Sequence, residues 1–131
     1  MSSLFTLALT GQSLILHDVR HVSDEGFAAI TELTRKADIA FTNFETTILG
    51  RHGGWPLKGS AFGCSPAAVL DCLKHMGFNA LALSNNHAFD LGPSGVLSTL
   101  EEVSRRDFLH AGIGTDATSA RRAGIKEFNE K

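Results

Sequence analysis

The chain takes its fold from the stretch Leu81-Ala82-Leu83-Ser84-Asn85-Asn86-His87-Ala88-Phe89-Asp90-Leu91-Gly92. An apolar run typical of a buried strand passes here directly into asparagine, histidine and aspartate side chains. Ligands of open parallel sheets collect beyond the carboxyl ends of the strands, so polar groups placed there serve function more often than polar groups elsewhere. The stretch therefore predicts a buried strand that is followed by a metal or phosphate site.

Length and charge limit the class of protein. The 131 residues are about the size of one ordinary domain, so we expect a single hydrophobic core. Twelve Lys and Arg residues stand against fourteen Asp and Glu residues, which gives a formal net charge of −2, and the basic residues are scattered along the chain. This balance argues against nucleic acid as a partner and against attraction to a membrane surface.

The compartment is predicted from the N-terminus and the cysteines. Met1-Ser2-Ser3 leads into an apolar run without a basic leader or a small-residue cleavage site. No apolar run approaches the ~18 residues of a transmembrane helix. Cys64 and Cys72 have neither zinc-knuckle nor thioredoxin spacing, which favours two reduced structural thiols. We therefore expect a cytoplasmic protein with no membrane segment.

Short apolar runs alternate with helical patterns. The runs that predict strands are residues 4–9, 39–42, 79–83 and 109–113. The amphipathic faces that predict helices are Phe27/Ile30/Leu33, Val69/Leu73/Met76 and Val96/Leu97/Leu100/Val103, with a short last helix after Thr115-Asp116. The order βαβαβαβα predicts an α/β fold with mainly parallel strands and right-handed crossovers.

Residues at the helix ends support this division of the chain. Ser65-Pro66 is expected to cap and open the second helix, Gly77 to end it, and Gly92-Pro93 to open the third. The glycine-rich connection over residues 46–65 is either a functional loop or a poorly ordered one, and the sequence leaves both interpretations open.

Polar residues follow three of the four predicted strands, as Gly11-Gln12-Ser13, Asn43-Phe44-Glu45 and Asn85-Asn86-His87. If the backbone stays extended, Asn43 and Glu45 point to the same face. A carboxylate, an imidazole and amide oxygens together suit Mn, Fe or Zn better than calcium. Asp90 lies close enough in sequence to orient His87 through its second ring nitrogen.

Turn formation is the simpler alternative, since Asn, Ser and Gly are common after strands. Three such clusters in register at three strand ends are hard to obtain from turn chemistry alone, which favours a site at this edge. Elsewhere, His17, Asp18, His21 and His52 are expected on the surface or in loops.

Two glycine motifs offer a competing interpretation. Gly112-Ile113-Gly114-Thr115-Asp116-Ala117 formally fits a dinucleotide fingerprint, but no further strand with an acidic residue follows it. Gly50-Arg51-His52-Gly53-Gly54 lacks the Lys-Ser/Thr ending of a phosphate loop and predicts a flexible connection, from which Arg51 or His52 could reach a substrate.

The motif residues closely resemble the CapA family, which is named for capsule and poly-γ-glutamate biosynthesis. The segments that carry the resemblance are Ala37-Asp38-Ile39-Ala40-Phe41-Thr42-Asn43-Phe44-Glu45, then Gly77-Phe78-Asn79-Ala80-Leu81-Ala82-Leu83-Ser84-Asn85-Asn86-His87 with Asp90 and Gly92, then His110-Ala111-Gly112-Ile113-Gly114. That family is similar in fold to the calcineurin-like metallophosphoesterases. The resemblance implies a half-sandwich, that is, a partial αββα metallophosphoesterase-like sandwich, with a metal centre at the strand ends.

By that resemblance, Asn43, Glu45, Asn86 and His87 are metal or phosphate contacts. His87 would be a ligand or an acid/base group, and Asn86 a ligand or an oxyanion donor. In a complete homologue two divalent cations about 3.5–4 Å apart would activate water for attack on a phosphoester. Such a homologue would hydrolyse a phosphoester or act in envelope-polymer synthesis.

Two departures from the family pattern qualify this expectation. Gln12 stands after Gly11 where the family usually has Asp, which makes it a weak neutral ligand. The family's later H-W-G and G-H-x-H motifs do not occur, so we expect residues 1–131 to be the N-terminal part of a CapA-like domain. The alternative function is a truncated, non-catalytic or partner-completed module. Its exposed apolar sheet face would favour self-association.

Overall fold

The computed structural model describes residues 4–57 and 63–127. The elements are β1 (Leu7–Ser13), α1 (Glu25–Lys36), β2 (Ile39–Phe44), β3 (Thr47–Leu49), β4 (Cys64–Pro66), α2 (Ala68–His75), β5 (Ala80–Ala82), α3 (Gly92–Arg105), β6 (Leu109–Ala111) and α4 (Ala117–Ala120). The predicted alternation of strands and helices is confirmed, with β3 and β4 added between β2 and α2. The fold is α/β with parallel sheets.

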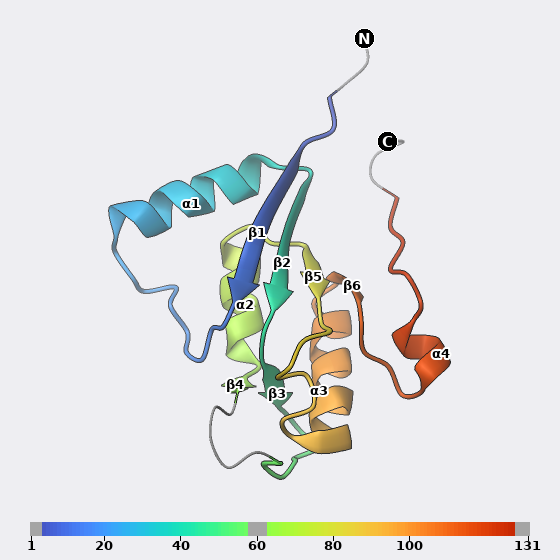
Figure 1. Cartoon of the computed structure of the whole chain (residues 1–131). Helices are drawn as coiled ribbons and strands as arrows, with labels where there is room; N and C mark the ends of the chain where they lie inside the picture. The colour runs from blue at the N-terminus through green and yellow to red at the C-terminus, as the bar shows by residue number, and fades with distance from the viewer. Residues whose placement is uncertain (1–3, 58–62, 128–131) are drawn as a thin grey trace.

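The main sheet has the order β1-β2-β5-β6, and all its neighbouring strands are parallel. Figure 1 shows the four arrows pointing the same way, so their carboxyl ends meet at the lower edge of the sheet. The predicted gathering of strand ends at one edge is therefore confirmed. Among the described residues, no helix is long and apolar enough to cross a membrane.

The hydrophobic core lies between one face of the main sheet and the helices α2 and α3, which Figure 1 shows behind and below it. Ala40, Thr42 and Phe44 of β2 are buried on this face. Leu81 of β5 is paired in register with Thr42 and is also buried. Val69, Leu70 and Leu73 of α2 and Val103 of α3 belong to the same cluster. Burial of this kind contributes about 1.5–3 kcal/mol per large apolar side chain.

The opposite face of the sheet is more open. Leu7 and Leu9 of β1 are 59% and 70% exposed. They lie in register with Ile39 and Phe41 of β2, which are half-buried. The alternation of buried and half-buried residues along β2 is typical of a strand with one fully covered face.

The connection over residues 46–65 contains two short strands at its ends. Its two ends form the parallel pair β3–β4, with Thr47 opposite Cys64 and Leu49 opposite Pro66. Helix α3 covers this pair, and Thr99 of α3 accepts the backbone N–H of Ile48 at 3.0 Å. The predicted cap at Ser65-Pro66 is wrong because both residues belong to β4, and α2 begins after Ala67 without a side-chain cap.

Helix α1 is rotated away from its predicted packing face. Ile30 and Leu33 are 49% and 67% exposed, whereas Thr31 and Thr34 are buried. The hydroxyl of Thr34 donates to the Met76 carbonyl at the end of α2. The helix is thus held by short polar contacts to the end of α2 rather than by its apolar stripe.

Gly77 is required at the point where α1 approaches α2. Its φ is +94°, and a Cβ atom there would lie 2.8 Å from the backbone of Arg35. Arg35 in turn donates from Nε to the His75 carbonyl at 2.7 Å. The predicted glycine end of α2 is confirmed: Gly77 follows the C-cap Met76 and adopts the left-handed conformation that glycine allows.

Candidate functional site

The first two strands bring Gln12 and Asn43 side by side. Gln12 pairs in register with Asn43, and Asn43 pairs with Ala82 of β5. Gln12 lies inside β1 rather than after it, since this strand ends at Ser13 instead of the predicted Leu9. Its side chain is exposed. The register therefore places Gln12, the predicted weak ligand, beside Asn43, another predicted ligand.

Asn43 and Glu45 contact each other, as their spacing predicts. The Asn43 Nδ2 atom donates to Glu45 Oε2 at 3.0 Å. The Glu45 backbone N–H donates to the Ser13 carbonyl at 3.2 Å, which continues the β1–β2 pairing past the end of β2. The Glu45 carboxylate is half-buried, so its orientation is fixed by neighbours while one side stays open.

Asn85 joins the loop after β5 to the end of β2. Its Nδ2 atom donates to the Phe44 carbonyl at 2.8 Å and to Asn43 Oδ1 at 3.3 Å. Its Oδ1 atom accepts the backbone N–H of His87 at 2.9 Å. Sequence reasoning missed this role, although the double asparagine that follows an apolar strand was its signal. Asn85 thus sets the positions of Asn43 and His87 relative to each other.

His87 is held by a buried carboxylate. Its Nδ1 atom lies 2.7 Å from Asp90 Oδ2, and the Asp90 side chain has no exposed surface. The same Oδ2 atom accepts the backbone N–H of Gly63 at 2.7 Å. A carboxylate in this position favours the tautomer with its proton on Nδ1, which leaves the Nε2 lone pair for a ligand or a proton.

Gly63 packs closely against His87. A Cβ atom there would lie 3.0 Å from the Cγ and Nδ1 atoms of the His87 ring. The ring is therefore fixed on one side by Asp90 and on another by the backbone that precedes β4. Its side chain keeps 13% of its surface exposed.

The donor atoms at this edge are few. Glu45 supplies one carboxylate, His87 supplies one imidazole, and Asn86 is exposed in the turn between Asn85 and His87. The described residues contain no group of three or more His, Cys, Asp or Glu side chains that could hold a metal ion. Among the described residues, this edge therefore supplies fewer charged donors than a pair of divalent cations needs for charge compensation.

The remaining polar residues singled out in the sequence lie elsewhere. Asp18 forms an ion pair with Arg20. Its Oδ1 atom also accepts a hydrogen bond from the Cys72 thiol, with 2.9 Å between sulfur and oxygen. The hydrogen bonds from Arg20 and Cys72 hold the pKa of Asp18 well below its usual range. His52 contacts Glu101 at 2.9 Å on the surface. Both cysteines are free thiols.

The glycines of the two competing motifs are explained by packing. At Gly112, with φ +112°, a Cβ atom would lie 2.7 Å from the Ser84 backbone nitrogen. The helix that follows spans only Ala117–Ala120, too short for the long crossover helix of a dinucleotide fold. Gly50 and Gly53 form an isolated antiparallel bridge that closes a tight turn.

Comparison with known proteins agrees with the motif residues. Residues 6–131 match the family described as bacterial capsule synthesis protein PGA_cap. Two relatives from Sinorhizobium fredii (strain NBRC 101917 / NGR234), the uncharacterized proteins y4sH and y4uA, are each 32% identical over 127 residues. The match covers 94% of this chain and 28% of each relative. The CapA resemblance is thereby confirmed, and the chain belongs to the PGA_cap family of bacterial capsule synthesis proteins.

Proposed function

We propose that this chain contributes the strand-end part of a metal-dependent phosphoesterase site in capsule or poly-γ-glutamate synthesis. The observation that supports the proposal is the hydrogen-bonded series Glu45–Asn43–Asn85–His87, which connects the Glu45 carboxylate to the backbone N–H of His87 at one edge of the sheet. The substrate would be a phosphoester or an envelope polymer that carries one.

Each residue has a chemical task in this proposal. Glu45 and His87 would hold a divalent cation of the Mn, Fe or Zn type, with Asn86 as a further oxygen donor or as a donor to an oxyanion. When bound, such a cation polarises a phosphoryl oxygen and lowers the pKa of its water. Asp90 keeps the His87 ring oriented, and Asn43 keeps the Glu45 carboxylate in place.

A non-catalytic or partner-completed module is the second candidate. The small number of donors among the described residues favours it, as a phosphoesterase of two cations needs more carboxylates and histidines than this edge supplies. The chain also spans 28% of the length of the curated relatives it matches, so the activity of a whole protein is a proposal here.

Two free thiols are consistent with the proposed cytoplasmic location.

Metal titration separates the two candidates. Mn²⁺ is added to the wild-type chain and to Glu45→Gln, His87→Ala and the surface control His17→Ala, with binding followed by calorimetry and hydrolysis by a chromogenic phosphate monoester. The phosphoesterase proposal expects binding that weakens at least tenfold in the two site variants and is unchanged in the control. Binding without hydrolysis supports the non-catalytic module, and an equal response in all four proteins contradicts a metal site at Glu45 and His87.

A further inference from the structure

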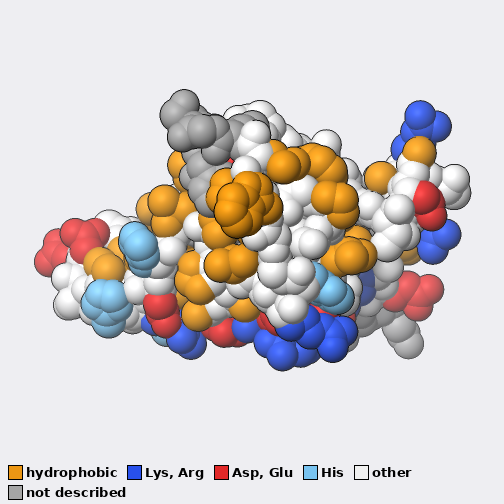
Figure 2. Space-filling view, turned by 90° about the horizontal axis from the view of Figure 1, so that it is seen from below, with side chains coloured by type: hydrophobic (Ala, Val, Ile, Leu, Met, Phe, Trp, Pro, Cys, Tyr) orange, Lys and Arg blue, Asp and Glu red, His pale blue; other side chains and the backbone are white. Residues whose placement is uncertain are grey.

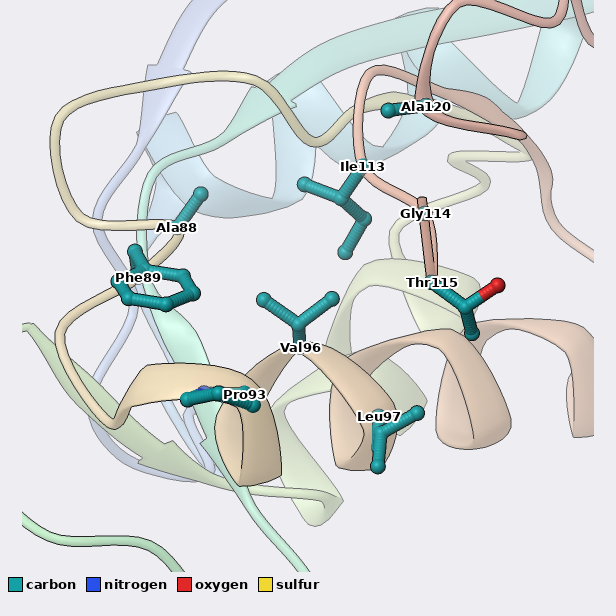
Figure 3. Close-up of a pocket in the computed structure, with 9 residues that line it drawn as sticks. All are labelled: Ala88, Phe89, Pro93, Val96, Leu97, Ile113, Gly114, Thr115 and Ala120. Atoms are coloured by element: carbon teal, nitrogen blue, oxygen red, sulfur yellow. The ribbon is translucent and has the colours of Figure 1, made fainter. Parts of the chain in front are cut away.

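A pocket of about 470 Å³ lies beside the turn that carries His87. Figure 3 shows Ala88 and Phe89 on one side, Val96 rising from α3 below, and Ile113 on the opposite side. Pro93 and Leu97 extend the lining along α3, and Thr115 contributes a polar side chain. Pockets for small molecules commonly have volumes of about 300–1,000 Å³ and mostly apolar walls.

The pocket adjoins the candidate site through the chain itself. Ala88 and Phe89 follow His87 directly, and consecutive Cα atoms lie about 3.8 Å apart. The lining of the pocket therefore begins one residue after His87 along the chain. None of the residues that line the pocket carries a charge, so a phosphate does not fit inside it and an uncharged chain does.

The far wall of the pocket is closely packed. Asp116 caps α4, accepting the Ser119 backbone N–H at 2.7 Å, and Ala120 at the end of this helix lines the pocket. A Cβ atom at Gly114 would lie 2.3 Å from the Ala120 backbone nitrogen, so the loop and the helix touch. The wall opposite Ala88 and Phe89 is thus formed by the loop at Gly114 and a short capped helix, with no room for a larger residue at position 114.

Two aromatic side chains in connecting segments of the described chain are strongly exposed. Phe89 is 55% exposed and Trp55 is 79% exposed. Figure 2, which looks at the strand carboxyl ends from below, shows hydrophobic side chains gathered on this face. Leu57, 58% exposed, is tied to the site by its backbone N–H, which donates to the Asp90 carbonyl at 2.9 Å.

We propose that this pocket binds the apolar chain of an amphiphilic phosphate monoester whose phosphate lies at His87 and Glu45. The inference rests on the proposed function and narrows its substrate class from phosphoesters in general to esters of an aliphatic alcohol. The link is the Asn86–His87–Ala88 turn, where the polar site ends and the apolar lining begins.

The test compares three probes by site-resolved NMR of the ¹⁵N-labelled chain in the presence of Zn²⁺. The probes are inorganic phosphate, hexyl phosphate and hexanol. We expect hexyl phosphate to bind at least tenfold more tightly than either of the others. Its resonance shifts should include Val96, Leu97 and Ile113 in addition to His87 and Glu45, whereas phosphate should shift His87 and Glu45 and leave the three pocket residues unchanged.

Two variants probe the pocket directly. Ala120→Phe fills it from the far wall, and Leu97→Asp places a charge at its rim. Both should remove the tenfold advantage of hexyl phosphate and leave phosphate binding at the wild-type level. Ala117→Phe, on the exposed side of the same short helix, is the matched control and should keep the advantage.

The failures are distinguishable. Three outcomes overturn the pocket inference and leave the proposed function standing. They are equal affinity for phosphate and hexyl phosphate, tighter binding of hexyl phosphate that persists in both pocket variants, and hexanol binding as tightly as hexyl phosphate. An absence of any His87 response to inorganic phosphate overturns the proposed function, and the inference with it.

Discussion

His87 Nδ1 and Asp90 Oδ2 lie 2.7 Å apart, and the aspartate side chain has no exposed surface. A buried carboxylate is costly unless its oxygens are hydrogen-bonded, and here Oδ2 also accepts the Gly63 backbone N–H. The pair therefore holds two segments, the turn after β5 and the chain before β4, around one imidazole ring.

Replacing Asp90 by Asn should destabilise the chain by about 1–3 kcal/mol, because the hydrogen bonds that His87 and Gly63 donate to the charged Oδ2 atom weaken when a neutral amide oxygen accepts them. Chemical denaturation measures this loss. Glu25→Gln, an exposed carboxylate in the first turn of α1, is the control and should stay within about 0.5 kcal/mol of wild type. A variant as stable as wild type would show that the contact between His87 and Asp90 does not stabilise the fold.

The adjacent asparagines should behave differently. Asn85→Ala removes three hydrogen bonds around a half-buried amide and should lower the free energy of unfolding by about 1–3 kcal/mol. Asn86→Ala, at an exposed position, should change stability by less than about 0.5 kcal/mol. Side-chain amide resonances of Asn43 should shift in Asn85→Ala only. Equal losses of stability in the two variants would contradict the linking role of Asn85.

Gly95 of α3 should not tolerate a methyl group. In an exposed helix Gly→Ala stabilises by about 1 kcal/mol, but a Cβ atom at Gly95 would lie 2.6 Å from Leu91 Cβ and from Thr47 Oγ1. Gly95→Ala should therefore destabilise, by about 1–3 kcal/mol, as overpacked cores do. Ser104→Ala on the exposed side of the same helix should be neutral or slightly stabilising. A stabilising Gly95→Ala would show that α3 moves freely against β3.

Asp71 and Arg106 join α2 to the end of α3 through two hydrogen bonds, of 2.6 and 3.0 Å. The hydrogen bonds from Arg106 lower the pKa of Asp71, although burial opposes the shift. The stabilisation is then fully present above the unfolded Asp pKa of about 3.9 and is lost as the pH falls through the lowered folded pKa.

Asp71→Asn should cost about 1 kcal/mol or less at pH 6, a modest amount because the Asp71 side chain is 40% exposed. The stability curves of variant and wild type should converge below about pH 4. Denaturation at pH 6 and pH 3 measures both points. A difference that grows on acidification would have the wrong sign for this pair.

The outer edge of β1 should pair with a second copy of the chain. This strand is an edge of the main sheet, contains no charged residue or proline, and exposes Leu7 and Leu9 on one face. Two such edges can pair antiparallel without charge repulsion, so we expect concentration-dependent dimers in light scattering. Leu9→Lys should yield monomers, whereas Leu33→Lys, exposed on α1, should not. Monomeric wild type at high concentration would rule the pairing out.

The sequence predicts the main sheet and its site because the signals there are local. Alternating apolar runs mark β2 and β5, and the spacing of Asn43 and Glu45 places both on one face. The pair β3–β4 could not be predicted, since strands of three residues carry no periodicity and are stabilised by α3, which lies far along the chain.

Helix α1 shows a second limit. Its apolar stripe correctly predicts a helix, but the face that packs is decided by the hydroxyl of Thr34 and the backbone at Gly77, contacts that no periodicity encodes. At the site, the contact between His87 and Asp90 follows from their spacing of three residues. The role of Asn85 depends on the end of β2 and becomes visible only when the strands are side by side.

The pairing of β1 with β2 carries one residue more on the β1 side between Leu9 and Gln12. In an unbroken ladder Gly11 would oppose Asn43, and the Gln12 amide would turn toward the core opposite Phe44. The extra residue forms a β-bulge that reverses the alternation of side chains along β1. Leu9 and Gln12 therefore lie on the same face although they are three positions apart. Loss of either Thr10 or Gly11 would restore a regular ladder and leave Gln12 beside Asn43. Insertions and deletions at this point are thus a route by which the first strand can vary in length without displacing its contribution to the site.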